Sequence, residues 1–452
     1  MNKLLKVFFF FLLFKNCLAE SFLSDDFKDA LISAFNNNPK IMSERAKLYE
    51  IDELYPQALS SFRPVIEGFY NKGKTDTSTS GSNFISNDGV KTETSKGIII
   101  TQRVFDGGSS LSEISEAKNL IISQRYKLKS IEQEILLNAT KVYAKITSQY
   151  SNLKLSKKNV EFLKKQFEST KNQFEIGDLT LTDVSIAKSR LLLAESNLIK
   201  VESELEAIKE EYLSIIGKYP DNPELFFNFP KFKKNLEEIK NSCIQRNPDI
   251  LSMRYLILSE EKKISRLYRK KLPSVELKAE LRKDSGYFKF DSDREIMSAY
   301  ANVDIPIYQS GLAASKIRES KQKMESTKEL LKSEINDLKY NIVNFWFIFR
   351  SSDSKINAYK EQVKANTNFL EGLNQEFFLG ERTILDVLDG EQELLMSELD
   401  LVKSLEEYFN SFFEILSLQG DLNPIYLNLP VKNFNYEENF NKVKFKWLDI
   451  VE

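Results

Sequence analysis

The chain has 452 residues, of which 29% are charged, and its formal net charge is −2 at pH 7. This balance gives no support to nucleic-acid binding, so nucleic acid is not an expected partner. The sequence contains no histidine, the commonest general base and transition-metal ligand, which argues against hydrolytic triads and zinc sites. We expect no cofactor and no enzyme, because no set of nucleophile, base and oxyanion donor is recognisable.

Residues 1–19 have the pattern of a secretory signal peptide. Two lysines precede an apolar run over residues 7–14, and Ala19 ends a cleavage site of small residues. The apolar run is too short to cross a bilayer as a helix, so cleavage after Ala19 is expected, with a retained membrane anchor as the alternative. Cleavage would leave Cys243 as the one cysteine, which predicts a packed apolar residue and not a disulfide.

The first repeat, residues 20–220, begins with short predicted helices and a pair of strands. A helix break is expected at Asn38–Pro39, because proline suits the first turn of a new helix, and Pro64 is expected to end that helix. Strands are then expected at 65–75 and 91–105, on either side of a loop rich in Ser, Thr, Asn and Gly.

A long helical hairpin is expected after these strands. Ser109–Glu175 contains neither proline nor glycine, and as one helix it would be about 100 Å long. The next segment has apolar residues at alternating spacings of three and four, which is typical of a coiled coil. These positions are Val184, Ala187, Leu191, Ala194, Leu198, Val201, Leu205, Ile208, Tyr212 and Ile215. Gly217 is expected to end this second helix.

The same plan recurs in the second repeat, residues 221–424, where Asn247–Pro248 repeats the helix break. Strands are expected at 274–283 and 295–305, followed by a second long hairpin. The first of these strands alternates apolar with charged residues, as a barrel strand between lipid and a water-filled lumen requires. A half-buried strand of a soluble sheet alternates in the same way and is the alternative. The C-terminal tail, 425–452, lacks periodicity and is expected to pack outside the helices.

Each predicted hairpin bends at a short turn that contains glycine, which relaxes the backbone. The first turn is Gly177-Asp178-Leu179-Thr180 and the second is Gly380-Glu381-Arg382-Thr383, and an aspartate follows each of them, at Asp183 and Asp386. Only the second copy carries an arginine, Arg382, and a further acid, Asp389. This asymmetry makes the second turn the stronger candidate for a functional site.

The hairpins and strands both predict self-association. Two paired helices have little core of their own and need partners to bury their apolar seam. Four strands cannot close a barrel, and strands in lipid must close because an unsatisfied edge group costs several kcal/mol. A symmetric oligomer is therefore expected. Two copies would supply eight strands and three would supply twelve, and the need for a lumen favours three.

Three stretches, Thr101–Gly108, Val303–Gly311 and Gly380–Asp389, closely resemble the TolC family of outer-membrane efflux and secretion ducts. The likeness covers about residues 25–424 and keeps order and spacing in both halves. It implies a mainly α fold with transmembrane β-strands, in which duplicated long helical hairpins form a coiled-coil tunnel. The four strands per chain would contribute to a twelve-stranded trimeric β-barrel in the cell outer membrane, above a long periplasmic extension.

The resemblance also implies a function and partners. The chain would be the exit duct of a tripartite efflux or type I protein secretion system, a passive channel-tunnel that other components open. The partners would be two further copies of the chain in a homotrimer, a periplasmic adaptor (membrane fusion) protein, an inner-membrane ABC or RND-type transporter, and outer-membrane lipid. The resemblance does not distinguish an exported drug from an exported protein.

Residue by residue, the resemblance places Asp386 and Asp389 in the constriction, as residues of the pore gate that set its selectivity. Arg382 would pair with Thr182 and Asp183 of a neighbouring hairpin and latch the tip closed. The structural alternative for Asp386 is a helix N-terminal acid that interacts with the helix dipole.

The tips themselves would contact the adaptor, through Gly177, Asp178, Thr180, Gly380, Glu381 and Thr383. A plain helix-turn-helix connection is the structural alternative there. One departure concerns Phe377, where the family often has a tyrosine whose hydroxyl joins the latch. Because phenylalanine cannot form that hydrogen bond, part of the closing network would be missing or replaced.

A soluble periplasmic coiled-coil adaptor or scaffold without a barrel is the alternative function. Long helical hairpins fit such a protein equally well. An adaptor, however, would carry small β-domains outside its hairpin, whereas this sequence predicts one strand pair inside each repeat. The strand pairs therefore favour the duct.

Overall fold

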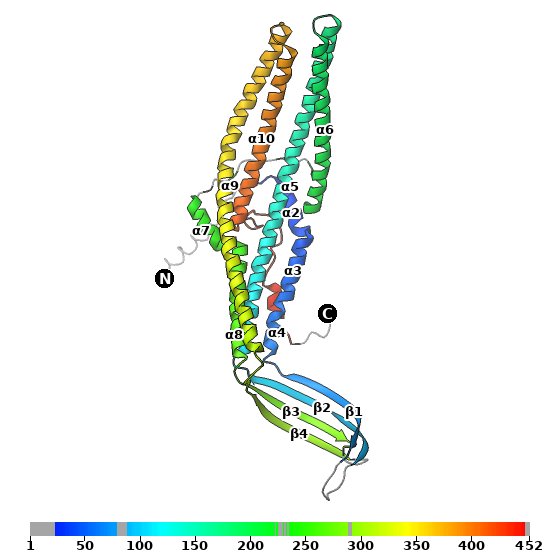
Figure 1. Ribbon diagram of the computed structural model, residues 1–452, viewed down its shortest axis with the longest axis vertical. Helices are drawn as coiled ribbons and strands as arrows, with labels where there is room; N and C mark the ends of the chain where they lie inside the picture. Colours follow the sequence, from blue (N-terminus) through cyan, green and yellow to red (C-terminus); the bar gives the residue numbers. More distant parts are fainter. Residues whose placement is uncertain are drawn as a thin grey trace, which may run out of the picture. The chain divides into compact units, whose positions relative to one another are not determined.

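The computed structural model describes residues 23–78, 88–221, 223–224, 229, 232, 235–287 and 292–447 (Figure 1). The predicted signal peptide, residues 1–19, lies outside the described residues. The chain divides into two compact units, each built from segments of both predicted repeats. The described residues within 23–45, 128–250 and 334–434 form the hairpin unit, and those within 46–127, 251–333 and 435–447 form the sheet unit.

The helices and strands follow the predicted order, except that the single helix expected between Pro39 and Pro64 is divided into two helices and the tail contains a helix that was not predicted. The helices are α2 (Asp25–Asn37), α3 (Pro39–Asp52), α4 (Leu54–Ser60), α5 (Ser109–Glu175), α6 (Leu181–Ile216), α7 (Leu236–Arg246), α8 (Pro248–Arg269), α9 (Leu312–Phe378), α10 (Ile384–Gln419) and α11 (Glu438–Val443). The strands are β1 (Val65–Thr77), β2 (Gly89–Phe105), β3 (Ser274–Ser285) and β4 (Asp293–Asp304). The prediction of a helix over Ser109–Glu175 is confirmed at both ends, and α5 and α9 each contain 67 residues.

The sheet unit contains one antiparallel sheet with the strand order β1-β2-β3-β4. The strand pairs extend beyond the predicted ends. In the first pair, for example, Asp76 lies opposite Val90 and Thr77 opposite Gly89, so pairing continues into the segment expected as a polar loop. Within the described residues, β1 and β4 are edge strands, and each has one side without a strand partner.

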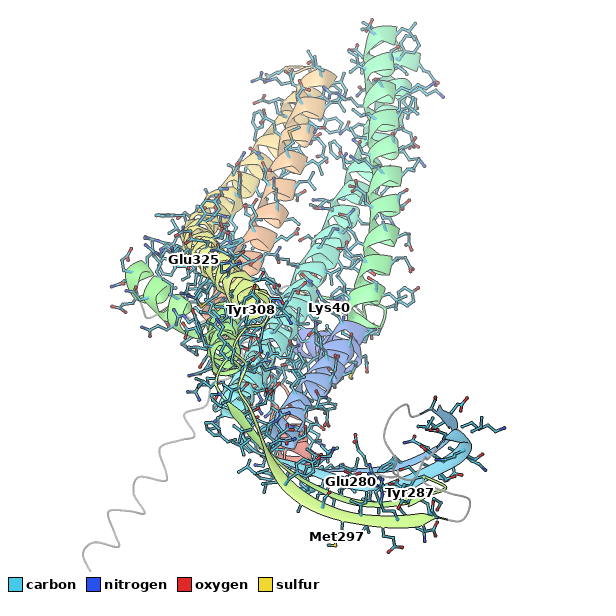
Figure 2. The ribbon with its side chains drawn as sticks, turned by 60° about the horizontal axis from the view of Figure 1, so that its bottom comes forward. Lys40, Glu280, Tyr287, Met297, Tyr308 and Glu325 are labelled. Atoms are coloured by element: carbon cyan, nitrogen blue, oxygen red, sulfur yellow. The ribbon has the colours of Figure 1, made fainter. Side chains whose placement is uncertain are left out.

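The two faces of this sheet differ in chemistry. Directly paired residues of an antiparallel sheet point to the same face, and successive residues point to opposite faces. One face carries apolar residues: Ile66, Tyr70, Ile98, Ile100, Val275, Leu277, Leu281, Met297 and Val303. The other carries Glu67, Arg103, Glu276, Lys278, Glu280, Arg282, Asp284 and Arg294. Glu280 and Met297 lie on opposite faces in Figure 2.

Helices α8 and α5 pack together within the sheet unit. The Ser123 hydroxyl donates to the Ser252 carbonyl at 2.8 Å, and the Ser252 hydroxyl donates back to the Ser123 carbonyl at 2.9 Å. The small serines allow this close approach of two backbones. Arg266 Nε donates to Glu116 Oε2 at 2.7 Å and joins the same two helices.

The C-terminal tail contains the short helix α11, which the sequence pattern did not predict. Asn439 Nδ2 donates to Asp52 Oδ2 at 3.0 Å, and the rings of Phe440 and Tyr55 meet edge to face at 5.1 Å. Arg125 pairs with Glu437 at 2.8 Å. These contacts fasten the tail to α3, α4 and α5 within the sheet unit.

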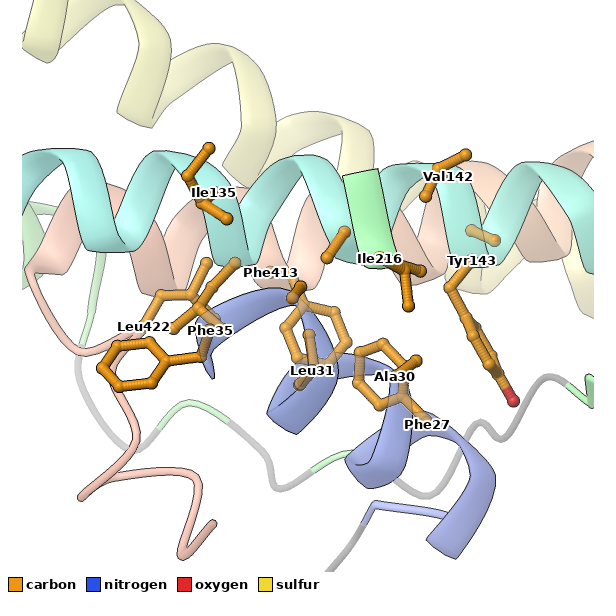
Figure 3. Close-up of a cluster of buried hydrophobic side chains, with 14 of the residues drawn as sticks. Phe27, Ala30, Leu31, Phe35, Ile135, Val142, Tyr143, Ile216, Phe413 and Leu422 are labelled. Atoms are coloured by element: carbon orange, nitrogen blue, oxygen red, sulfur yellow. The ribbon is translucent and has the colours of Figure 1, made fainter. Parts of the chain in front are cut away.

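The core of the hairpin unit forms around α2 (Figure 3). Ser24 caps the helix, accepting a hydrogen bond from the Phe27 amide, and the apolar face buries Phe27, Leu31 and Phe35. The Phe27 ring lies 4.8 Å from Tyr143 of α5, and 5.5 and 5.4 Å from Phe409 and Phe413 of α10. One short helix thus ties the two long hairpins together through aromatic packing.

The predicted helix ends of the hairpin unit are confirmed. Gly217 and Gly420 both have φ values in the left-handed region, 84° and 79°, and their amides bond back into the last turns of α6 and α10. Cys243 is buried in α7, as expected of an apolar residue. None of the helices in the described ranges combines the length and the hydrophobicity that crossing a membrane requires.

Phe27→Ala tests the role of α2. Removing a fully buried aromatic ring leaves a cavity, so the substitution should cost about 3–5 kcal/mol of stability and lower the midpoint of thermal unfolding followed by far-UV circular dichroism. Phe378→Ala is the matched control, since the Phe378 side chain is exposed and its removal should change stability by less than about 0.5 kcal/mol. Equal midpoints for the two variants would contradict the central position of α2.

Candidate functional site

The two hairpin tips have the same backbone construction. Gly177 and Gly380 have φ values of 91° and 78°, a conformation that side-chain-bearing residues rarely adopt. Asp178 N donates to Gln173 O and Glu381 N donates to Glu376 O, both at 2.9 Å, so each long helix ends in a Schellman motif. The sequence similarity between the two predicted turns therefore reflects an identical local fold.

Capping boxes start the returning helices at both tips. Asp183 N donates to Thr180 Oγ1 at 3.3 Å, and Thr180 N donates back to Asp183 Oδ2 at 2.9 Å. Thr383 and Asp386 repeat this arrangement at the same distances. The hydroxyl and amide of Thr383 donate to the Asp386 carboxylate and hold its pKa below the usual range. Asp386 therefore acts as an acidic residue at the N-terminus of α10, which was the structural alternative to the gate role.

The candidate gate residue Asp389 is engaged differently. Arg190 Nη2 of α6 donates to Asp389 Oδ1 of α10 at 2.8 Å, which joins the first hairpin to the second. Both side chains are partly exposed, at 36% and 56%. The ion pair places a positive charge beside one of the two predicted gate carboxylates.

Arg382 has a local partner. Its Nε donates to Glu376 Oε2 at 2.8 Å, across the turn of its own hairpin, and this pairing raises the pKa of the guanidinium. Thr182 is exposed, and Asp183 is occupied by its capping box. Within one chain the structure does not bring Arg382 to Thr182 or Asp183, so the latch stays a prediction about neighbouring copies.

The predicted adaptor-contacting residues, Gly177, Asp178, Thr180, Gly380, Glu381 and Thr383, are all exposed. Large apolar side chains surround them at the surface: Ile176, Leu181, Phe378 and Leu379 are 65–76% exposed. Each tip therefore offers an accessible turn flanked by apolar side chains.

Behind the tips lies an apolar cluster that draws on α5, α6, α9 and α10. Phe377 is 8% exposed and belongs to it, together with Ile384 and Val387. The ring of Phe377 therefore contributes to packing at the position where the family often has a tyrosine.

Sequence reasoning missed two charged residues at this site, Arg190 and Glu391. No local pattern marks Arg190, because its partner lies on the other hairpin. Glu391 had a signal, since it follows Ile384 and Val387 at coiled-coil spacing and so occupies a position normally filled by an apolar residue. Across the described residues, no group of three or more His, Cys, Asp or Glu side chains could hold a metal ion.

Thr383→Ala tests the capping box of α10. Losing the hydroxyl should cost about 1 kcal/mol of local helix stability and speed amide exchange in the first turn of α10 about fivefold, as measured by hydrogen–deuterium exchange mass spectrometry. Thr383→Ser keeps the hydroxyl and should leave exchange unchanged, and Thr180→Ala should affect only α6. Unaltered exchange in Thr383→Ala would show that the cap does not hold this turn.

Comparisons with known proteins agree with this arrangement. Residues 31–217 and 240–420 match the model of the family described as outer membrane efflux protein. The chain is 24% identical over 431 residues to the outer membrane efflux protein BepC of Brucella suis biovar 1 (strain 1330), a match that covers 95% of this chain and 92% of BepC. It is 29% identical over 119 residues to the outer membrane protein TolC of Escherichia coli (strain K12), covering 26% of this chain and 24% of TolC.

The fold is similar to the crystal structure of the Campylobacter jejuni CmeC outer membrane channel, with a TM-score of 0.80 at 14% sequence identity. That match covers 94% of this chain and 90% of CmeC. The predicted TolC-family resemblance, the mainly helical fold with a four-stranded antiparallel sheet, and the location in the outer membrane are confirmed. The family is described as outer membrane efflux proteins, which favours the duct over the soluble scaffold. The chain belongs to the outer membrane efflux protein family.

Proposed function

We propose that the chain is the exit duct of a tripartite efflux or type I protein secretion system, a passive channel that a periplasmic adaptor and an inner-membrane ABC or RND-type transporter open. Family membership supports an efflux channel. The construction of the sheet is the observation that carries the proposal furthest.

The sheet supports a homotrimer. One face carries most of the large exposed apolar side chains, such as Met297 at 89%, with charged residues such as Lys283 and Glu295 near the β3–β4 turn. The other face carries most of the charged side chains of the sheet, several of them in ion pairs. Among these pairs are Arg103 with Glu276 at 3.3 Å and Arg294 with Asp284 at 2.8 Å. A lipid-facing surface and a water-facing surface fit this division. Edge strands β1 and β4 would then pair between copies, and three copies would supply twelve strands.

The gate is proposed at the tip of the second hairpin, where Asp386 and Asp389 would face the constriction. Arg190 changes the expected charge of this gate. Two carboxylates and one guanidinium leave one net negative charge per chain at this level, so three copies would form a weaker cation-attracting ring than the two acids alone.

Closure and docking complete the proposal. When the copies assemble, the Arg382 side chain would leave Glu376 and pair with Thr182 and Asp183 of a neighbouring hairpin. This pairing would hold the tip closed. An adaptor would dock on the exposed turns Gly177–Thr180 and Gly380–Thr383, where the flanking apolar side chains provide contact area.

Planar-bilayer recordings of the purified protein test the duct and the gate together. The unmodified protein should give a small, cation-selective conductance, and Asp386→Asn with Asp389→Asn should remove the selectivity because the carboxylate charges are lost. In the Asp386→Asn variant the side-chain amide oxygen would still accept the hydrogen bonds from Thr383, so the cap would survive. If the ion selectivity of the pores were unchanged by the substitutions, the gate would have to lie elsewhere. Folded protein that forms no pores would contradict the proposal that the chain is a duct.

Arg190→Gln makes the converse prediction. Without the guanidinium, Asp389 would contribute its full charge, so cation preference in the same recordings should increase. Lys188→Gln is the matched control, because Lys188 is exposed on the same helix two residues away. An unchanged preference in Arg190→Gln would mean that this ion pair does not act on the permeating ion.

A further inference from the structure

A cavity of about 320 Å³ lies between the two hairpins, lined by residues of α5, α6 and α10. All of it belongs to the hairpin unit. Its apolar wall includes Leu163, Ala194 and Leu388, and its polar wall includes Ser156, Asn159 and Glu391. The volume exceeds that of a single water molecule about tenfold, so a small organic molecule fits.

Glu391 is the unusual group in this lining. It is 8% exposed, and within the described ranges none of the hydrogen bonds or ion pairs reaches its carboxyl group. A buried carboxylate without a partner is costly, and burial accordingly raises the pKa of Glu391 to about 7. Asn159 is also 8% exposed and lines the same cavity, so a second buried polar side chain faces this space.

The nearby cations do not neutralise Glu391, because each has another acid. Their pairs are Arg190 with Asp389 at 2.8 Å, Lys158 with Glu398 at 3.5 Å and Lys200 with Glu204 at 3.8 Å. The α9 side chains in the adjoining apolar cluster, Leu370 and Leu373, carry no charge. Of these acids, Glu391 alone lacks a cation within 4.0 Å, although Lys158 acts on it from farther away.

We propose that this cavity binds a small organic cation, whose ammonium group pairs with Glu391 while its hydrocarbon part lies against the leucines. The chemistry of the two walls supports this class of ligand. The carboxylate supplies a charge opposite to that of the ammonium group, and the apolar wall gains from covering alkyl carbons. The Asn159 carbonyl offers a further acceptor for the ammonium protons.

Binding is coupled to the loss of one proton. The protonated Glu391 carboxyl group releases its proton to solvent, and the resulting carboxylate pairs with an ammonium that keeps all of its own protons. Because Glu391 is mostly protonated below pH 7 and mostly ionised above it, the apparent affinity increases with pH. Between pH 6 and pH 8 the ionised fraction changes about tenfold, which sets the expected change in Kd.

Isothermal titration calorimetry of the full-length, detergent-solubilised protein with n-butylammonium chloride tests the site. Kd should be about tenfold lower at pH 8 than at pH 6, and at pH 6 buffers of different ionisation enthalpy should reveal release of about one proton per ligand. n-Butanol, which has a similar hydrocarbon part but no charge, should bind much more weakly.

Glu391→Gln should abolish both the charge-dependent binding and the proton release. The glutamine side chain has nearly the shape of the protonated carboxyl group but cannot ionise. Glu393→Gln, on the exposed side of the same helix, should behave like the unmodified protein. If Glu391→Gln fails to fold, Leu193→Trp provides a second test. Leu193 lines the cavity and its side chain is 54% exposed, so the larger tryptophan ring should block entry of the ligand and weaken binding. Equal binding of butanol and butylammonium, or affinity independent of pH, would overturn the proposal. This site does not depend on the duct, since binding is measured without any conductance.

Discussion

The burial of apolar side chains between two long hairpins is the constraint on which the rest of this structure depends. A 67-residue helix exposes an apolar seam along its whole length and cannot cover it by itself. At one end of the hairpin unit, α2 packs Phe27 against both Tyr143 and Phe409. At the other end, all four long helices contribute to the apolar cluster behind the tips. Between these two packed regions lies the cavity lined by α5, α6 and α10, where Glu391 occupies a coiled-coil position that is normally apolar.

The duplicated turns show how one backbone design carries two different chemistries. A left-handed glycine and a threonine–aspartate capping box fix the same geometry at both tips. These groups already form the hydrogen bonds that the backbone needs at the two helix ends. The side chains at the remaining turn positions can therefore differ between the two tips. Leu179 in the first turn and Arg382 in the second differ in charge without altering the fold. The capping role of Asp386 is also compatible with a role in the pore, since a capped carboxylate keeps its negative charge.

Local patterns predicted most of the fold, and interactions between distant segments account for what they missed. The ends of α5, α6 and α10 follow from glycine, threonine and the absence of breakers, all of which act within a few residues. The tail helix α11 is short, and its contacts with Asp52 and Tyr55 come from a distant part of the chain. The pairing of Arg190 with Asp389 likewise depends on how α6 lies beside α10, which no sequence spacing encodes. The Glu376 partner of Arg382, by contrast, lies only six residues away and could have been considered from the turn alone.

The energies of these contacts indicate what separating the hairpins would require. The exposed ion pair between Arg190 and Asp389 contributes roughly 0.2–1 kcal/mol, whereas full burial of one leucine-sized side chain contributes about 1.5–3 kcal/mol. The apolar cluster behind the tips therefore holds the hairpins together, and the main effect of the ion pair is on the local charge. Breaking the ion pair alone would leave the cluster intact. Any movement of α10 away from α6 would expose Leu191, Val387 and Leu388 to water, and the free energy lost by that exposure opposes separation of the two hairpins.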